Sequence, residues 1–134
     1  MIVVDASVVS EILLRTDRGK HAEDQLLGGR TTLHAPHLLD LEVAQVLRRH
    51  NAAGELEAGR GLGAMGDLAD LPINRYPHGL LMARVWELRA NLTAYDAAYV
   101  ALAEVLRAPL LTCDRRLARA PGNLARVEIL GPPR

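Results

Sequence analysis

Four acidic side chains stand where strands are predicted to end or helices to begin. Asp5 follows the β-forming run Ile-Val-Val, and Asp114 follows Leu-Leu-Thr-Cys late in the chain. Asp96 opens an apolar helix, whereas Glu42 is spaced with leucine and valine on the core-facing stripe of another helix. Open α/β sheets place their binding sites beyond the carboxyl ends of the strands. We therefore expect these four carboxylates to converge.

A cluster of carboxylates has a definite chemical use. Carboxylates buried near one another raise each other's pKa, and desolvation opposes their ionisation. A divalent cation removes that cost, and an all-oxygen ligand set without His or Cys suits Mg²⁺ or Mn²⁺. Such an ion can orient a phosphodiester, lower the pKa of a bound water and stabilise charge on the leaving oxygen. The pattern thus indicates metal-assisted phosphoryl hydrolysis.

Each acid also has a purely structural interpretation. Thr93 precedes Asp96 by three residues in a capping-box pattern, Asp114 is a good N-cap, and Glu42 can pair with an arginine. The occurrence of all four acids at element ends, rather than any one of them, favours a site. Ser7 lacks the G-x-S-x-G pattern of a serine hydrolase, but its hydroxyl can bind a metal-bound water beside Asp5.

Strands and helices alternate along the chain. Predicted strands lie near 2–4, 31–35, 71–75, 110–112 and 127–130, and predicted helices near 6–14, 20–27, 39–51, 55–70, 79–90, 97–106 and 114–119. This alternation predicts a three-layer α/β domain with a central, mostly parallel sheet of four to five strands, flanked by helices. The run 2–4 has no polar alternation, so it is expected to be a central strand buried on both faces.

A glycine-rich segment within this pattern requires a separate interpretation. Residues 61–66 spell G-x-G-x-x-G, the dinucleotide-binding fingerprint. The fingerprint needs a strand directly before it, whereas residues 55–60 are charged and contain no β-former. We therefore predict a helix weakened by glycine over 55–70 rather than a nucleotide site.

Composition predicts one domain over residues 1–134. The chain is 49% apolar, and its sixteen basic residues balance sixteen acidic ones, so net charge does not indicate a polyanionic partner. Arg115 and Arg116 directly follow Asp114, which makes them candidates for phosphate contacts. The single cysteine excludes an internal disulfide, and neither a signal peptide nor a membrane span is recognisable. We expect a cytoplasmic protein with no membrane partner.

Four stretches together resemble a known family. They are I-V-V-D-A-S at 2–7, P-H-L-L-D-L-E-V-A-Q-V-L-R-R at 36–49, T-A-Y-D-A-A-Y-V-A-L-A-E at 93–104 and L-L-T-C-D-R-R-L-A-R-A at 110–120. In this order and at these separations they resemble PIN-domain ribonucleases of the VapC toxin type. The resemblance spans nearly the whole chain.

The resemblance implies a PIN-like fold and a Mg²⁺- or Mn²⁺-dependent endoribonuclease that leaves a 5′-phosphate and a 3′-hydroxyl. The family positions that are catalytic and metal-binding match Asp5, Glu42, Asp96 and Asp114, and secondary polar positions match Ser7 and Thr112. An RNA substrate, a homodimer and a cognate antitoxin of a type II toxin–antitoxin pair are also implied. The glycines over 59–66 depart from the better helix formers usual in the family.

Two alternative functions remain open from the residues. One is a non-catalytic PIN-like module that keeps the fold and binds only a partner. The other is a phosphate-transfer domain of the receiver or haloacid-dehalogenase type, which also places an acid after its first strand. Such domains need a lysine late in the sheet, whereas the only lysine here is Lys20, and the dehalogenase pattern needs a second acid where Ser7 stands.

Overall fold

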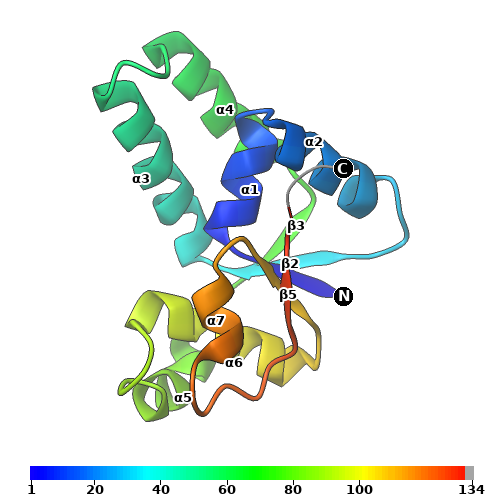
Figure 1. Cartoon of the computed structure of the whole chain (residues 1–134), viewed down its shortest axis with the longest axis vertical. Helices are drawn as coiled ribbons and strands as arrows, with labels where there is room; N and C mark the ends of the chain where they lie inside the picture. The colour runs from blue at the N-terminus through cyan, green and yellow to red at the C-terminus, as the bar shows by residue number, and fades with distance from the viewer. Residues whose placement is uncertain (132–134) are drawn as a thin grey trace.

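The computed structural model describes residues 1–131, and within them a parallel five-stranded sheet lies between two groups of helices (Figure 1). The strands are β1 (Ile2–Val4), β2 (Leu33–Pro36), β3 (Ile73–Tyr76), β4 (Leu110–Thr112) and β5 (Val127–Ile129), in the spatial order β3-β2-β1-β4-β5. Val3 lies opposite His34 of β2 and Leu110 of β4, so β1 is the central strand. The predicted α/β fold class is confirmed.

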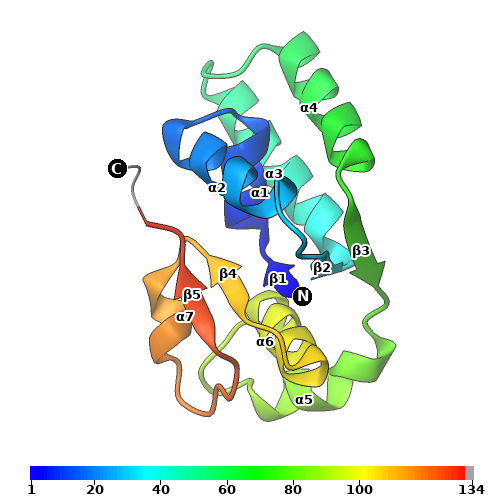
Figure 2. The same ribbon diagram turned by 90° about the vertical axis from the view of Figure 1, so that its right-hand side faces the viewer.

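The helices divide between the two sides of the sheet. Their bounds are α1 (Ala6–Leu13), α2 (Asp17–Leu27), α3 (Leu38–Ala52), α4 (Ala58–Asp70), the 3₁₀ helix η1 (Gly79–Leu81), α5 (Met82–Glu87), α6 (Ala94–Leu106) and α7 (Arg115–Arg119). Figures 1 and 2 show α1 to α4 on one side and α5 to α7 on the other. The division follows from the strand order, because right-handed crossovers change side when the chain reverses direction across a sheet.

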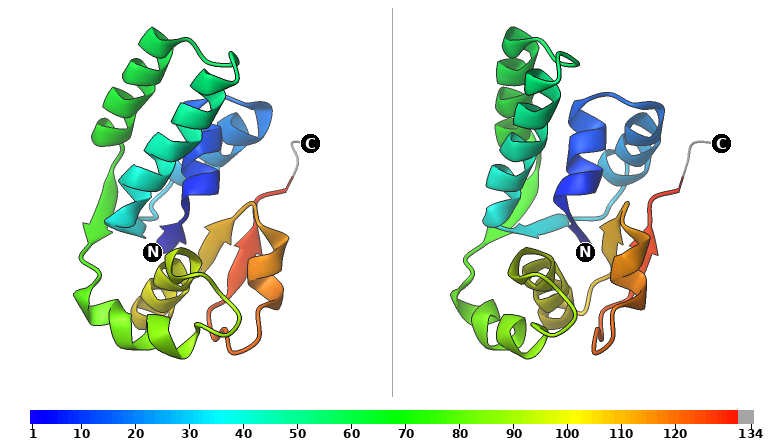
Figure 3. Two further views of the ribbon diagram at one scale, coloured as in Figure 1. Left: turned by 90° about the vertical axis from the view of Figure 1, so that its left-hand side faces the viewer. Right: turned by 60° about the vertical axis from the view of Figure 1, so that its left-hand side comes forward.

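The reversal of direction lies next to β1. The chain moves outward from β1 through β2 to β3, then returns past β1 to β4 and continues to β5. The two groups of helices therefore separate at the carboxyl ends of β1 and β4, and Figure 3 shows β1 between them. In open α/β sheets this switch point is where ligands bind. Asp5 follows β1 at this point, and Thr112 ends β4 there.

Burial explains why these elements hold their positions. Val3 and Val4 of β1 have no exposed surface, which is expected of a strand covered on both faces. Helix α6 is buried on nearly all sides from Ala97 to Ala103 and packs against β1, β2 and β4. The apolar helix predicted near 97–106 is therefore confirmed as the main support of the sheet on its side.

Several boundaries differ from the prediction for local reasons. Helix α2 starts at Asp17, three residues early, because the side chain of Thr16 caps it by accepting the Gly19 amide at 2.9 Å. The helix predicted over 79–90 divides into η1 and the short α5. The glycine-rich segment is helical as predicted, and a loop rather than a strand precedes it. Among residues 1–131, no helix combines the length and apolar character that crossing a membrane requires.

Candidate active site

Asp5 is fixed at the centre of the site by the helix that follows it. Its Oδ1 accepts the backbone amides of Ser7 (3.1 Å) and Val8 (3.2 Å), so Asp5 is the N-cap of α1. The residue is only 7% exposed. Burial raises the pKa of Asp5, and these hydrogen bonds act in the opposite direction.

Two hydroxyl groups complete the surroundings of Asp5. Ser7 Oγ donates to Asp5 Oδ1 at 2.5 Å, and Thr112 Oγ1 at the end of β4 donates to Asp5 Oδ2 at 2.5 Å. Ser7 Oγ also accepts the backbone amide of Cys113 at 2.9 Å. These contacts join the carboxyl ends of β1 and β4. Ser7 and Thr112, both predicted as secondary polar residues, thus lie against the first acid.

Glu42 reaches the site from α3 and is held by α6. The hydroxyl of Tyr99, a residue with 1% exposed surface, donates to Glu42 Oε1 at 2.7 Å. Burial raises the pKa of Glu42, and the negative charges of Asp96 and Asp5 add to the rise. The predicted core-facing position of Glu42 follows from this packing, although its partner is a tyrosine rather than an arginine.

Asp96 lies in the first turn of α6 and is half-buried. Thr93 Oγ1 accepts the Asp96 backbone amide at 3.1 Å, so the predicted cap is present. This bond uses the amide of Asp96 and not its carboxylate. Burial raises the pKa of Asp96, and the charges of Asp114 and Asp5 raise it further. Capping and membership of an acidic cluster are therefore compatible roles for this turn.

Among residues 1–131, Asp114 differs from the other three acids because it has a positively charged hydrogen-bond partner. It is the N-cap of α7, and it accepts both the backbone amide and the guanidinium of Arg116. The guanidinium hydrogen bond lowers the pKa of Asp114. Arg115 lies beside it on the surface with its side chain exposed.

The four acids influence one another through their charges. Asp96 and Asp5 raise the pKa of Glu42, and Asp114 and Asp5 raise the pKa of Asp96. Within residues 1–131, however, no three His, Cys, Asp or Glu side chains are close enough together to hold a metal ion by themselves. The structure thus brings the predicted acids together as an open cluster rather than a closed cage.

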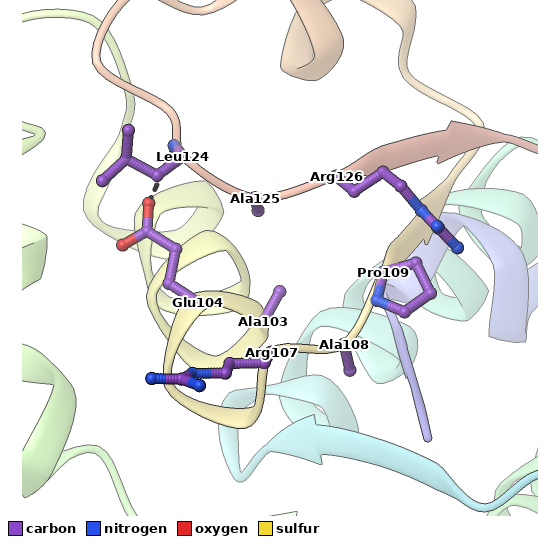
Figure 4. Close-up of a pocket in the computed structure, with 8 residues that line it drawn as sticks. All are labelled: Ala103, Glu104, Arg107, Ala108, Pro109, Leu124, Ala125 and Arg126. Atoms are coloured by element: carbon purple, nitrogen blue, oxygen red, sulfur yellow. Dashed lines mark hydrogen bonds between the residues drawn. The ribbon is translucent and has the colours of Figure 1, made fainter.

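Two of the surface pockets lie at opposite ends of strand β4. A pocket of about 360 Å³ is lined by Asp96, Asp114 and Arg116, beside the cluster. A pocket of about 520 Å³ lies instead at the amino ends of β4 and β5 (Figure 4). There Glu104 accepts the amide of Leu124 at 3.0 Å and pairs with Arg84 at 2.7 Å, which compensates its charge. The size of a pocket therefore does not locate the site in this fold, whereas the acids do.

Tyr99 was missed by sequence reasoning. Its spacing offered a signal, because residue 99 stands three positions after Asp96 and so lies on the same side of α6. The pairing of Arg116 with Asp114 was also missed, since both residues were considered for other roles.

The PIN domain family matches residues 2–123 of the chain. The chain belongs to the PIN-domain family. VapC ribonuclease Mb0985 of Mycobacterium bovis is 46% identical over 118 residues, covering 88% of this chain and 89% of that protein. Ribonuclease VapC1 of Mycobacterium tuberculosis is 43% identical over 132 residues, covering 96% of each. Within the PIN-domain family, the chain is therefore of the VapC type.

A solved structure supports the fold of this VapC-type PIN domain. VapBC2 from Rickettsia felis, determined bound to a DNA fragment from its promoter, matches with a TM-score of 0.70 at 13% identity. The match covers 96% of this chain and 98% of that one. PIN-domain membership replaces the receiver or haloacid-dehalogenase alternative that the acid after β1 had left open.

Proposed function

We propose that this PIN domain is a Mg²⁺- or Mn²⁺-dependent endoribonuclease and the toxin of a type II toxin–antitoxin pair. The observation that carries the proposal is the cluster of Asp5, Glu42, Asp96 and Asp114 at the switch point of the sheet. Its relatives named VapC ribonucleases give the substrate class, RNA. The neighbour solved as a VapBC assembly supports a cognate antitoxin as partner. A homodimer is proposed from the family resemblance alone.

The chemistry of the cluster fits a hard divalent cation. The donors are all carboxylate oxygens, and burial raises the pKa of three of the four acids, so a cation bound beside them would favour their charged forms. Magnesium commonly keeps several waters and takes only one or two carboxylates together with substrate phosphates. An open cluster is therefore suitable, and Asp5, Glu42, Asp96 and Asp114 would hold the ion, directly or through water.

The residues around the cluster have distinct proposed tasks. Bound there, a divalent ion would supply a low-pKa water as nucleophile and stabilise charge on the leaving oxygen. Ser7 and Thr112 hold the Asp5 carboxylate in one orientation, and Tyr99 does the same for Glu42. Arg115 and Arg116 are proposed to contact RNA phosphates beside the pocket, because guanidinium groups suit bidentate phosphate binding. Hydrolysis is proposed to leave a 5′-phosphate and a 3′-hydroxyl.

The proposal is tested by RNA cleavage with purified, metal-free protein. Mg²⁺ or Mn²⁺ is added to wild type, Asp5→Asn and Asp96→Asn, with structured RNAs as substrates. We expect each substitution to reduce cleavage roughly 100-fold or more, since loss of a group next to a metal already costs about 10- to 100-fold. Asp70→Asn, at an exposed position at the end of α4, is the matched control and should cleave normally.

Two outcomes would redirect the proposal. Cleavage that survives both substitutions and excess EDTA contradicts a metal-dependent mechanism at this cluster. No Mn²⁺ binding at millimolar concentration by calorimetry favours the non-catalytic interaction module instead. In the same preparations, Arg115→Ala should weaken RNA binding and reduce its dependence on salt if Arg115 contacts phosphate.

A further inference from the structure

Arg116 has an unusual position relative to the acidic cluster. Its Nε donates to Asp114 Oδ1 at 3.1 Å and its Nη2 to Asp114 Oδ2 at 3.0 Å, so the fork of the guanidinium engages both carboxylate oxygens. The side-chain donors that the structure assigns to Asp5 and Glu42 are neutral hydroxyls. Within residues 1–131, Asp114 is thus the one member of the cluster with a formal positive partner.

The position of this guanidinium is that of a cation bound to Asp114. Oδ1 accepts both the backbone amide and Nε of Arg116, and Oδ2 accepts Nη2, so Arg116 fills three of the roughly four acceptor positions of this carboxylate and a metal ion would compete with it for them. The charge of Arg116 also acts on Asp96: burial and the charge of Asp114 raise the pKa of Asp96, and Arg116 lowers it in part. It therefore neutralises part of the cluster in the metal-free protein.

The ion pair between Arg116 and Asp114 can separate at little energetic cost. The Arg116 side chain is 90% exposed and that of Asp114 is 29% exposed. Exposed ion pairs contribute little to stability, because water solvates both partners well when they separate. The backbone amide of Arg116 also donates to Asp114 at 2.9 Å, so the N-cap of α7 persists when the guanidinium leaves.

We propose that Arg116 is a displaceable counter-ion of the acidic cluster. In the metal-free protein it occupies Asp114, and when Mg²⁺ or Mn²⁺ binds it leaves the carboxylate and becomes available to a phosphate in the adjoining pocket. Arg116 and Asp114 both line that pocket, so the move needs a change of side-chain rotamer and no movement of α7. This inference rests on the proposed function, and it adds a competition between the protein's own arginine and the metal.

Competition has a measurable consequence for metal affinity. Removing Arg116 should tighten Mn²⁺ binding, and the gain should depend on the presence of Asp114. A general loss of positive charge would also tighten binding, but that effect is independent of Asp114. Substitution of Arg119 distinguishes these two causes. Arg119 lines the same pocket, but the structure assigns it no bond to Asp114.

The experiment is a double-mutant cycle measured by calorimetry with Mn²⁺ alone, at an ionic strength that screens distant charges. The proteins are wild type, Arg116→Gln, Asp114→Asn and the double variant, with Arg119→Gln as control. We expect Arg116→Gln to bind Mn²⁺ about threefold more tightly than wild type, as the strength of an exposed pair allows. In the Asp114→Asn background the same substitution should change affinity far less, and Arg119→Gln should resemble wild type.

A second readout observes Arg116 itself. The ¹⁵N-Hε resonance of Arg116, assigned by its loss in Arg116→Gln, should move on saturation with Mg²⁺ toward its position in metal-free Asp114→Asn. If wild type binds the metal while this resonance and the cycle stay unchanged, the counter-ion role is overturned and the proposed function stands. If wild type binds neither Mg²⁺ nor Mn²⁺, the proposed metal-dependent function fails first.

Discussion

One hydroxyl group orients Glu42. Tyr99 is almost fully buried, and its hydroxyl bonds Glu42 Oε1 at 2.7 Å across the space between α6 and α3. Tyr99→Phe keeps the packing of the ring and removes only this donor. Without it the pKa of Glu42 should rise further, because the hydrogen bond opposes the effect of burial. We expect a loss of cleavage of about tenfold, comparable to loss of other supporting contacts around a metal.

The pH profile separates an orienting role from a general loss of structure. The acid limb of the activity should move to higher pH in Tyr99→Phe, since more protons compete for Glu42. Tyr76→Phe is the matched control, because the Tyr76 hydroxyl bonds His34 at 2.6 Å and, within the described part of the chain, has no hydrogen bond to any of the four acids. An equal loss of activity in both variants, or an unmoved acid limb in Tyr99→Phe, would contradict the role given to Tyr99.

At the scale of the elements, two helical glycines differ in how a side chain at their position would affect stability. A Cβ at Gly19 of α2 would lie 1.9 Å from the Glu11 carbonyl oxygen, so the close contact between α1 and α2 depends on its absence. A Cβ at Gly63 of α4 would meet nothing within 4 Å. Glycine in a helix interior costs roughly 0.5–1 kcal/mol relative to alanine, because of the backbone entropy lost on folding. The glycines of α4 therefore weaken a helix that its buried face still holds.

We expect Gly63→Ala to stabilise the protein by about 0.5–1 kcal/mol and Gly19→Ala to destabilise it by about 2–3 kcal/mol, as forced overpacking does. Urea unfolding followed by circular dichroism measures both changes. Equal effects of the two substitutions would show that the contact between α1 and α2 is not as tight as described. The prediction from sequence considered the glycines over 59–66 and not Gly19, because spacing alone cannot show what a Cβ would meet.

At the scale of the whole molecule, the fold keeps several negative charges together at its switch point. The pKa of Asp96 is raised by burial and by the charges of Asp114 and Asp5. A carboxyl with a raised pKa in the folded state contributes stability below its unfolded pKa, about 3.9, and loses it as pH rises through the folded value. The charged cluster therefore opposes folding near pH 7 when no metal is bound.

Because the charge of Asp96 opposes folding, we predict that Asp96→Asn raises the midpoint of thermal unfolding of the metal-free protein at pH 7. The rise should be about 4 °C for a change on the order of 1 kcal/mol in a chain of this size, and it should vanish toward pH 4. Asp114→Asn is the control of opposite sign, because the pKa of Asp114 is lowered and its charge is stabilising at pH 7. Scanning calorimetry from pH 7 toward pH 4 measures the unfolding midpoints of both variants. A stabilisation by Asp96→Asn that is independent of pH would contradict the electrostatic cause.

Much of the fold and of the site was predictable from the residues alone. Periodicity and local chemistry, which depend only on neighbours in the chain, predicted three features. These are the uninterrupted apolar run of β1, the apolar sequence of α6 and the acids at the ends of elements. The family pattern predicted which acids belong together. Boundaries such as the start of α2 at Asp17 were less predictable, because a single cap decides them.

Tertiary structure decided the contacts between distant segments. The strand order places Asp5 beside Thr112, packing places the Tyr99 hydroxyl on Glu42, and neither can be derived from spacing across more than 50 residues. The choice of Arg116 as partner of Asp114 depended on a rotamer rather than on a pattern. The residue types at the ends of the elements are thus a property of the sequence. Which of them interact depends on distance in space, because hydrogen bonds need donor and acceptor about 3 Å apart and charge interactions weaken with distance and screening.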